Sequence, residues 1–383
     1  MLLAPQWFFG QNTGCGSIGG GKANTGERRP RNRYPIGVLS DYSISDYSLR
    51  GIIVESLPRP GSPKVSVVVL TFNAGSGFGG LLERLSAQGG SFNRELLVID
   101  SGSTDGTVES ARRCGATIHS LSRGEFDHGA TRNLAVSLSR GEYVAFLVQD
   151  ALPLDERWLS AMVENLERDE EVAGVYGRQI PRPESSPLAR ALVNDLPTAG
   201  LRRREQFAGG PGPYRETPPA AQRFLATFDN VSSCVRRSVW EDFPFERTGF
   251  GEDLRWGKGV VEAGYKLIYE PRSAVLHSHE RGSFYDFRRN YANGLVLLEL
   301  FGIAPTPNLA LLLLNVLRAS AHLYLRLRRD AKTSAVAPKL LVPAVRYAFC
   351  SQAGAYLAAL IHRRVGKKYS FSKRLNRFLN KGI

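Results

Sequence analysis

The chain has 383 residues, of which 43% are hydrophobic, 22% charged and 10% aromatic. This composition is typical of a globular protein and excludes a collagen-like or wholly disordered chain. The formal net charge is +14, and most of it lies in residues 281–383, where 18 Lys or Arg stand against three acidic residues. A basic segment of this kind indicates an anionic partner surface.

Four cysteines are spread along the chain, at positions 15, 114, 234 and 350. Their spacing fits neither a zinc finger nor a disulfide scaffold, so we expect free thiols in a reducing compartment. The first ten residues have no basic region and no small-residue cleavage site, so we expect no signal peptide. Residues 1–60 are rich in Gly, Ser, Asn and Arg, which predicts a disordered lead-in.

From Val65 onwards, short β-branched runs alternate with helical stretches, the pattern of βα units that build a mostly parallel sheet. We therefore expect an α/β catalytic domain over residues 61–300. The predicted strands are residues 65–71, 95–100, 117–121, 142–148, 172–179 and 265–269. The predicted helices are residues 78–88, 107–114, 130–138, 155–166 and 255–264. Residues 181–222 are rich in Pro, Gly and Arg and are predicted to form a mobile loop near the site.

Polar residues cluster where the first two strands end, which is where ligands bind in open α/β sheets. The first strand ends in Thr71-Phe72-Asn73, and the second runs into DSGSTDGT, residues 100–107. Their short hydroxyl and carboxylate side chains can bind a ribose and a base edge, and the glycines let the backbone approach a ligand. An ordinary helix cap would explain part of the same pattern.

A single carboxylate follows the strand at residues 142–148, in the sequence Gln149-Asp150-Ala151. An acid at a strand end beside a nucleotide pocket suits Mg²⁺ or Mn²⁺, hard ions that take oxygen ligands. Taken alone, Asp150 could equally cap the next helix.

Two acids and two histidines lie close together further along the chain. Glu252 and Asp253 begin a predicted helix, and His277-Ser278-His279 follows the next strand. This unit can supply a general base and an imidazole ligand. Side chains two residues apart on a strand point the same way, so both imidazoles are expected on one side. The acids alone would also fit favourable charges at a helix N-terminus.

Four segments, taken in order, resemble the family 2 glycosyltransferases of the GT-A fold, a Rossmann-like fold with a mostly parallel sheet. The segments are VSVVVLTFN (65–73), VIDSGSTDGT (98–107), GEYVAFLVQDALP (141–153) and EDLRWGKGVVEAGYKLIYEPRSAVLH (252–277). The resemblance covers residues 64–300. FDHGATRN (126–133), the QDA sequence, and HSH followed by FRRNYANG (287–294) resemble the bacterial rhamnosyltransferase branch.

The resemblance implies an inverting transfer from a nucleoside diphosphate sugar. Asp253 would be the base, supported by Glu252, and Asp150 with His277 would hold Mg²⁺ or Mn²⁺. The residues implied to bind the nucleotide sugar are Thr71, Phe72, Asn73, Asp100, Ser101, Asp105, Arg132, Asn133 and Gln149. The residues implied to line the acceptor site are Asn230, Ser232 and His279.

The chain departs from the family pattern at two positions. The usual Asp-x-Asp is here Gln149-Asp150-Ala151, so metal binding rests on fewer carboxylates. Gly259 stands six residues after Asp253, where the family often has Arg. Trp240 and Trp256 could stack on a sugar, but core packing is the favoured role for both.

Residues 301–383 are expected to form a basic, amphipathic helical region. Thr306-Pro307 is a good helix start, and the polar residues that follow lie three or four apart, as one stripe on a helix does. They are Asn315, Arg318, His322, Arg326 and Arg329. Because no stretch reaches about 18 uncharged residues, we expect this helix, and a second one at 338–364, to lie on an anionic membrane surface.

Packing on the catalytic domain, or contact between two copies in a homo-oligomer, is the alternative for this region. Nucleic acid is not an expected partner, since no binding motif is present.

The leading hypothesis is a cytoplasmic enzyme, peripheral on the inner face of the cell membrane. It would transfer L-rhamnose from dTDP-rhamnose to a lipid-linked or growing cell-surface polysaccharide. One alternative keeps the fold and uses a UDP-sugar donor of galactofuranose or a hexose. The other is a catalytically silent GT-A scaffold in glycan assembly, against which the presence of Asp150, Asp253 and His277 argues.

Overall fold

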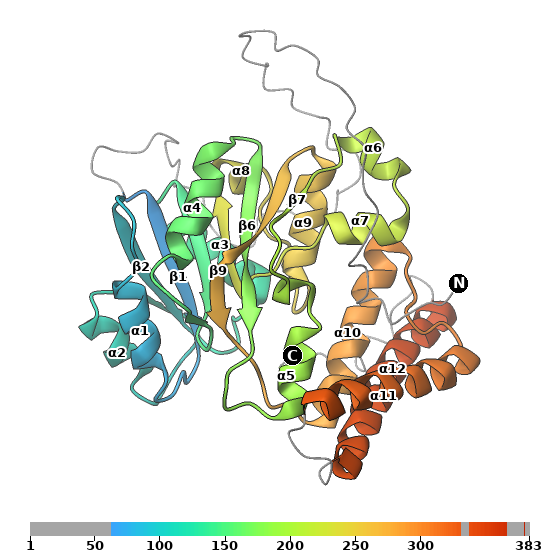
Figure 1. Cartoon of the computed structure of the whole chain (residues 1–383). Coiled ribbons are helices and arrows are strands. Elements are labelled where there is room, and N and C mark those ends of the chain that lie inside the picture. Colours follow the sequence, from blue (N-terminus) through green and yellow to red (C-terminus); the bar gives the residue numbers. More distant parts are fainter. Residues whose placement is uncertain (1–62, 331–336, 366–378, 380–383) are drawn as a thin grey trace. The chain divides into compact units, whose positions relative to one another are not determined.

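The computed structural model describes residues 63–330, 337–365 and 379 (Figure 1). The predicted disordered lead-in over residues 1–60 lies outside the described residues.

The described strands and helices begin with a βα alternation and end in three long helices. The strands are β1 (Val65–Thr71), β2 (Arg94–Asp100), β3 (Thr117–Ser120), β4 (Tyr143–Val148), β5 (Leu152–Pro153), β6 (Val172–Ile180), β7 (Arg204–Gln206), β8 (Ser232–Arg236) and β9 (Lys266–Leu276). The helices up to the sheet's last strand are α1 (Phe78–Ser86), α2 (Thr107–Arg113), α3 (His128–Leu138), α4 (Trp158–Arg168), α5 (Pro187–Asn194), α6 (Pro211–Glu216), α7 (Pro219–Leu225), α8 (Arg237–Asp242) and α9 (Glu252–Glu262). The last three are α10 (Ser283–Phe301), α11 (Leu309–Asp330) and α12 (Ala337–Val365).

In the described part of the chain, nine strands form one sheet in the order β3-β2-β1-β4-β8-β6-β9-β5, with β7 paired to β9. The pairs β1–β2, β1–β4, β2–β3 and β6–β9 are parallel, and β8 runs antiparallel to both β4 and β6. The prediction of an α/β fold with a mostly parallel sheet is confirmed. Strands β5, β7 and β8 were not predicted.

Strand β1 explains why the sheet is covered by helices on both faces. Its run of apolar residues is buried throughout, with Val65, Val67 and Val69 in one core cluster and Val68 in the other. Alternate residues of a strand point to opposite faces, so a continuous apolar strand needs a helical layer on each. Helices α1 and α4 contribute to the first cluster, and α3 and α9 to the second.

The register of the sheet brings the ends of distant strands to one edge. Thr71 pairs with Asp100, Leu70 with Val148, and Ile180 with Leu276. Since β1, β2, β4, β6 and β9 all run in the same direction, the residues that follow them meet at this edge. In sheets of this type that edge is the usual ligand site.

The predicted mobile loop at residues 181–222 is wrong. This segment holds α5, β7, α6 and the start of α7, together with a 3₁₀ turn at Pro197–Ala199. Pro187, Pro211 and Pro219 stand at the first turns of their helices. Proline is favoured there because the first N–H groups of a helix have no partner within it.

The three C-terminal helices pack on one another and on the catalytic region (Figure 1). Gly354 of α12 lies so close to the backbone of Phe287 on α10 that a Cβ would clash, and Gly294 lies against Ala358. Helix α11 contacts α5, where Arg326 forms an ion pair with Asp195. The packing alternative for this region is therefore present in the structure.

Within the described residues, the helix Leu309–Arg329 has the length and apolar composition that could cross a membrane, and 17% of its most apolar window is buried. This finding concerns length and composition alone. The predicted helix start at Thr306-Pro307 lies just before the observed one: α11 begins at Leu309, and the Asn308 side chain accepts from the Leu311 N–H (2.8 Å) at this end of the helix.

Candidate active site

Asp100, at the end of β2, organises the loop that was predicted to bind a nucleoside. Its carboxylate accepts hydrogen bonds from the hydroxyls of Thr71 (2.9 Å) and Ser103 (2.5 Å). It also accepts from the backbone N–H groups of Gly102 (3.0 Å) and Ser103 (2.9 Å). These four bonds occupy the acceptor positions of a carboxylate. Asp100 therefore shapes the loop from within, while the loop's other residues present its surface.

Asn73 and Asp105 join the loops after β1 and β2. The Asn73 N–H donates to Ser103 Oγ (2.8 Å), and Asn73 Oδ1 accepts from the Thr104 N–H (2.8 Å). Asp105 Oδ2 accepts from the Gly75 N–H (2.9 Å). Asn73 has a left-handed backbone, with φ of 44°, a conformation that Asn tolerates better than most residues. Both side chains are exposed at the edge where β1 and β2 end.

Gln149 occupies the first position of the metal motif and binds the backbone of Phe72 with both ends of its amide. Gln149 Oε1 accepts from the Phe72 N–H (2.7 Å), and Gln149 Nε2 donates to the Phe72 carbonyl (3.1 Å). A carboxylate could accept but not donate here. The glutamine therefore joins the ends of β1 and β4, which accounts for its presence in place of an acid.

Asp150, His277 and His279 form a group that can hold a metal ion, with their ligand atoms all within 4.8 Å of one another. His277 Nε2 lies 3.7 Å from Asp150 Oδ1, and His279 Nδ1 lies 3.4 Å from Asp150 Oδ2. The Arg182 guanidinium donates to the Asp150 carbonyl (2.5 Å). His279, which was predicted to line the acceptor site, thus lies with Asp150 and His277 in this group.

The surroundings of His277 fit the role of a metal ligand. Its Nδ1 lies 2.9 Å from Gln179 Oε1, and Gln179 Nε2 donates to Asp229 Oδ2 (2.6 Å). Because the Gln179 oxygen can only accept, Nδ1 carries the proton, and Nε2 keeps its lone pair toward Asp150. Burial lowers the pKa of His277 to about 3, so the imidazole is neutral at physiological pH, as a ligand must be.

Glu252, the first residue of α9, forms a buried ion pair with Arg132 of α3. Glu252 Oε1 lies 2.9 Å from Arg132 Nη1, and the Asn230 amide donates to the same oxygen (3.3 Å). Burial opposes ionisation of Glu252, but the charges of Arg132 and His128 prevail and hold its pKa below the usual value. Glu252 therefore remains an anion.

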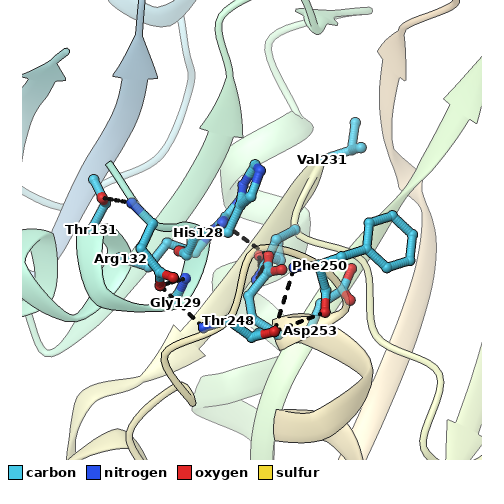
Figure 2. A network of polar contacts seen from close by, with 12 residues as sticks. His128, Gly129, Thr131, Arg132, Val231, Thr248, Phe250 and Asp253 are labelled. Atoms are coloured by element: carbon cyan, nitrogen blue, oxygen red, sulfur yellow. Dashed lines mark hydrogen bonds and ion pairs between the residues drawn. The ribbon is translucent and has the colours of Figure 1, made fainter. Parts of the chain in front are cut away.

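Asp253 follows Glu252 and is partly buried in the same cavity. Burial, together with the negative charges of Glu252 and Asp229, raises the pKa of Asp253 to about 8. A carboxylate with a pKa near the working pH is well suited to accept a proton in a reaction. Figure 2 draws the surrounding network, in which His128 and Arg132 belong to α3 and Asp253 to the start of α9.

The FDHGATRN sequence has a positioning role in this network. Asp127 caps α3 by accepting from the N–H groups of Gly129 (3.1 Å) and Ala130 (2.9 Å), and it also accepts from the Thr248 N–H (3.2 Å). A Cβ on Gly129 would clash with the Glu246 carbonyl. The start of α3 thus holds the segment that leads into Asp253 (Figure 2).

Three of the predicted site residues have side chains engaged elsewhere. Asn133 donates to the Phe245 carbonyl (2.8 Å) and accepts from Trp240 Nε1 (2.8 Å). Ser232 is buried within the sheet and accepts from Trp158 Nε1 (2.8 Å). The Arg132 guanidinium is paired with Glu252. The structure therefore brings neither Asn133 nor Ser232 to the metal group, and Arg132 is neutralised where it stands.

A cavity of about 630 Å³ connects the metal group with the acids of α9. This is within the usual size of a ligand pocket. One wall carries Asp150, His277 and Asp253, and the wall across from it comes from α5 and the three C-terminal helices. Its lining includes, from those helices and the segment before α10, Leu192, Arg281, Arg289, His322 and Tyr347.

Gln179 and Asp229 were not predicted as site residues, and packing of the C-terminal helices on the catalytic domain was predicted only as an alternative. The position of Gln179 at the end of a predicted strand was a usable signal. The hydrophobic pattern of the C-terminal helices does not show which of their residues face the cavity.

Residues 66–226 match a family model described as glycosyl transferase family 2. The O-antigen chain rhamnosyltransferase RfbN of Salmonella typhimurium is 30% identical to the chain over 239 residues, which cover 61% of this chain and 72% of that protein. The O-antigen chain rhamnosyltransferase WbaN of Salmonella anatum is 29% identical over 250 residues, with the same shares of the two chains. The chain therefore belongs to glycosyl transferase family 2.

Among solved structures, the mannosyltransferase PcManGT from Pyrobaculum calidifontis, in complex with GDP-Man and Mn²⁺, aligns with a TM-score of 0.49. It is 21% identical, and the alignment covers 82% of this chain and 91% of that chain. Family membership makes the protein a glycosyltransferase with rhamnosyltransferase relatives, which favours an enzyme over the silent scaffold.

Proposed function

We propose that this glycosyltransferase transfers L-rhamnose from dTDP-rhamnose, with inversion, to a hydroxyl of a lipid-linked or growing cell-surface polysaccharide. The observation that carries the proposal is the single cavity lined both by Asp253 and by the group Asp150, His277 and His279. A base and a cation site in one cavity are what a transfer from a nucleoside diphosphate sugar needs.

The donor would bind at the edge formed by the ends of β1 and β2. Asn73 and Asp105 are exposed there. The Ser101 hydroxyl is buried and has no hydrogen-bond partner within the described residues. A buried hydroxyl of this kind is satisfied when a ligand supplies the partner. The O-antigen rhamnosyltransferase relatives support L-rhamnose as the sugar and a polysaccharide as the acceptor.

Asp150, His277 and His279 would hold Mg²⁺ or Mn²⁺. Two imidazoles beside one carboxylate favour Mn²⁺, since Mg²⁺ prefers oxygen ligands. When bound, the cation supplies neutralisation of the negative charge on the diphosphate.

Asp253 would act as the general base. Its carboxylate takes the proton of the acceptor hydroxyl while that oxygen forms a bond to the anomeric carbon and the bond from this carbon to the diphosphate breaks. Glu252 supports the base by its charge, because a neighbouring anion raises the proton affinity of Asp253. The pair with Arg132 keeps Glu252 ionised and in position.

Exposed apolar side chains on the last two helices support attachment to the inner face of the cell membrane. On α11 and α12 they are Leu309, Leu313, Leu314, Leu317, Leu325, Leu341, Val342, Val345 and Phe349. We call these nine residues the apolar face. The exposed Arg328 and Arg329 lie on the same helices, and basic residues beside an apolar face suit an anionic bilayer. Residues 61–300 would thus carry catalysis, and residues 301–383 the membrane contact.

Calorimetric titration of the protein with dTDP, UDP and GDP, each with and without Mn²⁺, tests the donor assignment. We expect dTDP to bind most tightly and Mn²⁺ to strengthen its binding. A preference for UDP would keep the reaction and change the sugar, and the absence of binding to all three would refute the proposed function.

A further inference from the structure

The diphosphate of a nucleotide sugar needs positive charge, and Arg132 does not supply it. Its guanidinium is buried against the Glu252 carboxylate at 2.9 Å, so the two charges already neutralise each other. Three other arginines line the same cavity: Arg223 on α7, Arg281 and Arg289. Arg281 lies just before α10, two residues after His279, and Arg289 lies two turns further along α10.

Neither Arg281 nor Arg289 has a carboxylate within 4.0 Å among the residues that the structure describes. Each guanidinium lies over an aromatic ring instead, Arg281 over Tyr285 at 5.1 Å and Arg289 over Phe250 at 5.5 Å. By contrast Arg255, near the start of α9, is paired with Glu299. Within the described residues, Arg281 and Arg289 therefore lie in the cavity lining without a carboxylate in direct contact.

Two cavity acids, Asp286 and Asp229, interact electrostatically with these arginines without forming an ion pair of 4.0 Å or less. At Asp229 the charge of Arg289 opposes the rise in pKa that burial causes. Asp286 lies on the first turn of α10 and is buried, and burial raises its pKa, although Arg281, Arg289 and Arg346 oppose the shift. Partial burial of a guanidinium group that has no carboxylate in contact destabilises the folded state, unless an anion from solution binds and balances the charge.

We infer that Arg281 and Arg289 form a binding site for a phosphate or diphosphate group inside the cavity. The inference rests on the proposed function, because two substrates of that reaction carry such a group: the nucleotide sugar and the lipid-linked acceptor. Guanidinium groups suit this ligand, since their N–H groups match phosphate oxygens in pairs. The site would supply the positive charge for the diphosphate, in place of Arg132, which the resemblance implied to bind the nucleotide sugar.

The first test is calorimetric titration of the whole chain with inorganic pyrophosphate in the presence of Mn²⁺. We expect Arg281→Gln and Arg289→Gln each to weaken binding about tenfold, the loss typical of one charged hydrogen-bonding partner. Arg281→Lys, which keeps the charge, should lose less. Arg202→Gln removes an exposed arginine outside the cavity and outside the C-terminal helices, and this variant should bind pyrophosphate as the original protein does. Unchanged binding in both cavity variants would overturn the inference.

The second test separates the two sources of the phosphate group. If the variants lose affinity for the nucleoside diphosphate that the protein prefers, the site serves the donor. If they lose affinity only for farnesyl diphosphate in detergent micelles, it serves the acceptor. A loss in neither overturns the inference. An original protein that binds pyrophosphate but no nucleoside diphosphate would refute the proposed function and leave the anion site standing.

A structural role for the two arginines makes a different prediction about stability. Replacing either arginine with glutamine should leave the Tm of the ligand-free protein equal to or higher than that of the original protein, because the repulsion between the two positive charges is removed. A drop in Tm together with lost binding would mean that the arginines hold the fold, and would overturn the assignment of a binding site.

Discussion

Arg132 and Glu252 form an ion pair with side chains 5% and 8% exposed, joining α3 to the start of α9 at 2.9 Å. The pair keeps an anion beside Asp253, and that anion is one reason for the high pKa of Asp253. The FDHGATRN sequence and the two acids at the start of α9 are therefore one structural unit.

Replacing Arg132 with Gln should leave Glu252 buried and unpaired. We expect the free energy of unfolding to fall by about 3–5 kcal/mol, as for other broken buried pairs. Urea denaturation monitored by circular dichroism measures the loss. Arg157→Gln is the matched control, because the Arg157 side chain is 73% exposed in its pair with Asp155, and exposed pairs contribute little to stability. Equal losses in the two variants would contradict this account.

Replacing Asp253 with Asn should stabilise the protein while leaving nucleotide binding intact. The carboxyl is held beside two other acids, and removing its charge should raise the free energy of unfolding by roughly 1–2 kcal/mol at pH 9. Differential scanning calorimetry and a nucleoside diphosphate titration measure both effects. Asp242→Asn, at an exposed position outside the cavity, should change neither quantity. A lower free energy of unfolding in Asp253→Asn would show that the charge of the Asp253 carboxylate does not destabilise the folded protein.

The pH dependence of kcat/KM should report the raised pKa of Asp253. A base must be deprotonated to act, so the rate should rise with pH and level off above about 8. Glu252→Gln removes a neighbouring anion and releases Arg132, and both changes favour the charged form of Asp253. The rising limb should therefore move to lower pH in that variant. A limb that stays in place would exclude Asp253 as the titrating group.

The same pKa sets the sign of a stability effect. An Asp has a pKa of about 3.9 in the unfolded chain, and Asp253 has one of about 8 when folded. The folded state therefore holds the proton more tightly, and the contribution of this group to stability falls as pH rises from about 4 to 8. Urea denaturation of the original protein and of Asp253→Asn at pH 6 and pH 9 measures this effect. The difference in the free energy of unfolding between the two proteins should be larger at pH 9 than at pH 6.

Gln179 should control metal affinity without touching the metal. Its oxygen lies 2.9 Å from His277 Nδ1 and fixes the imidazole, and loss of such a partner typically weakens a metal site 10- to 100-fold. Gln179→Leu should show this loss in a Mn²⁺ titration followed by electron paramagnetic resonance, and His277→Ala a larger one. Unchanged Mn²⁺ affinity in Gln179→Leu would contradict the assignment of His277 as a ligand.

The apolar face on α11 and α12 should govern membrane binding. Leu313→Ser with Leu317→Ser removes two leucines that are 61% and 69% exposed, and we expect binding to anionic phospholipid vesicles to weaken at least about tenfold. Leu201→Ser is the control, since Leu201 is 73% exposed and lies outside these helices. Unchanged vesicle binding, or a change in oligomeric state instead, would favour a contact between two copies.

The sheet was predictable because its strands carry continuous β-branched runs, which only a strand buried on both faces needs. Strand β8 was missed because Ser232 and Ser233 break its apolar pattern, although both are buried. The structured segment after β6 was mistaken for a loop because proline marks loops and helix starts alike. Local sequence patterns therefore predicted the strands and helices with strong periodicity. The prediction failed where one residue type is common in two kinds of structure.

The residue types of the candidate site could be predicted from the sequence. The hydrogen bonds and ion pairs between those side chains were harder to predict. Asp150 and His277 follow strands, and the sheet register brings them together as expected for strand ends. The pairing of Arg132 with Glu252, and of Asn133 with Trp240, depends on how α3 packs against distant segments. Such contacts between separate elements leave no periodic signal in the sequence, so Arg132 and Asn133 were assigned to the nucleotide sugar.

The most direct test of the central claim is transfer from dTDP-rhamnose to a bacterial lipid-linked glycan fraction with Mn²⁺ present, followed by mass spectrometry of the lipid product. The original protein should add a single deoxyhexose, and Asp253→Asn should do so about 10²- to 10⁴-fold more slowly while binding dTDP equally well. Equal transfer by the two proteins would contradict the role of Asp253 as the base.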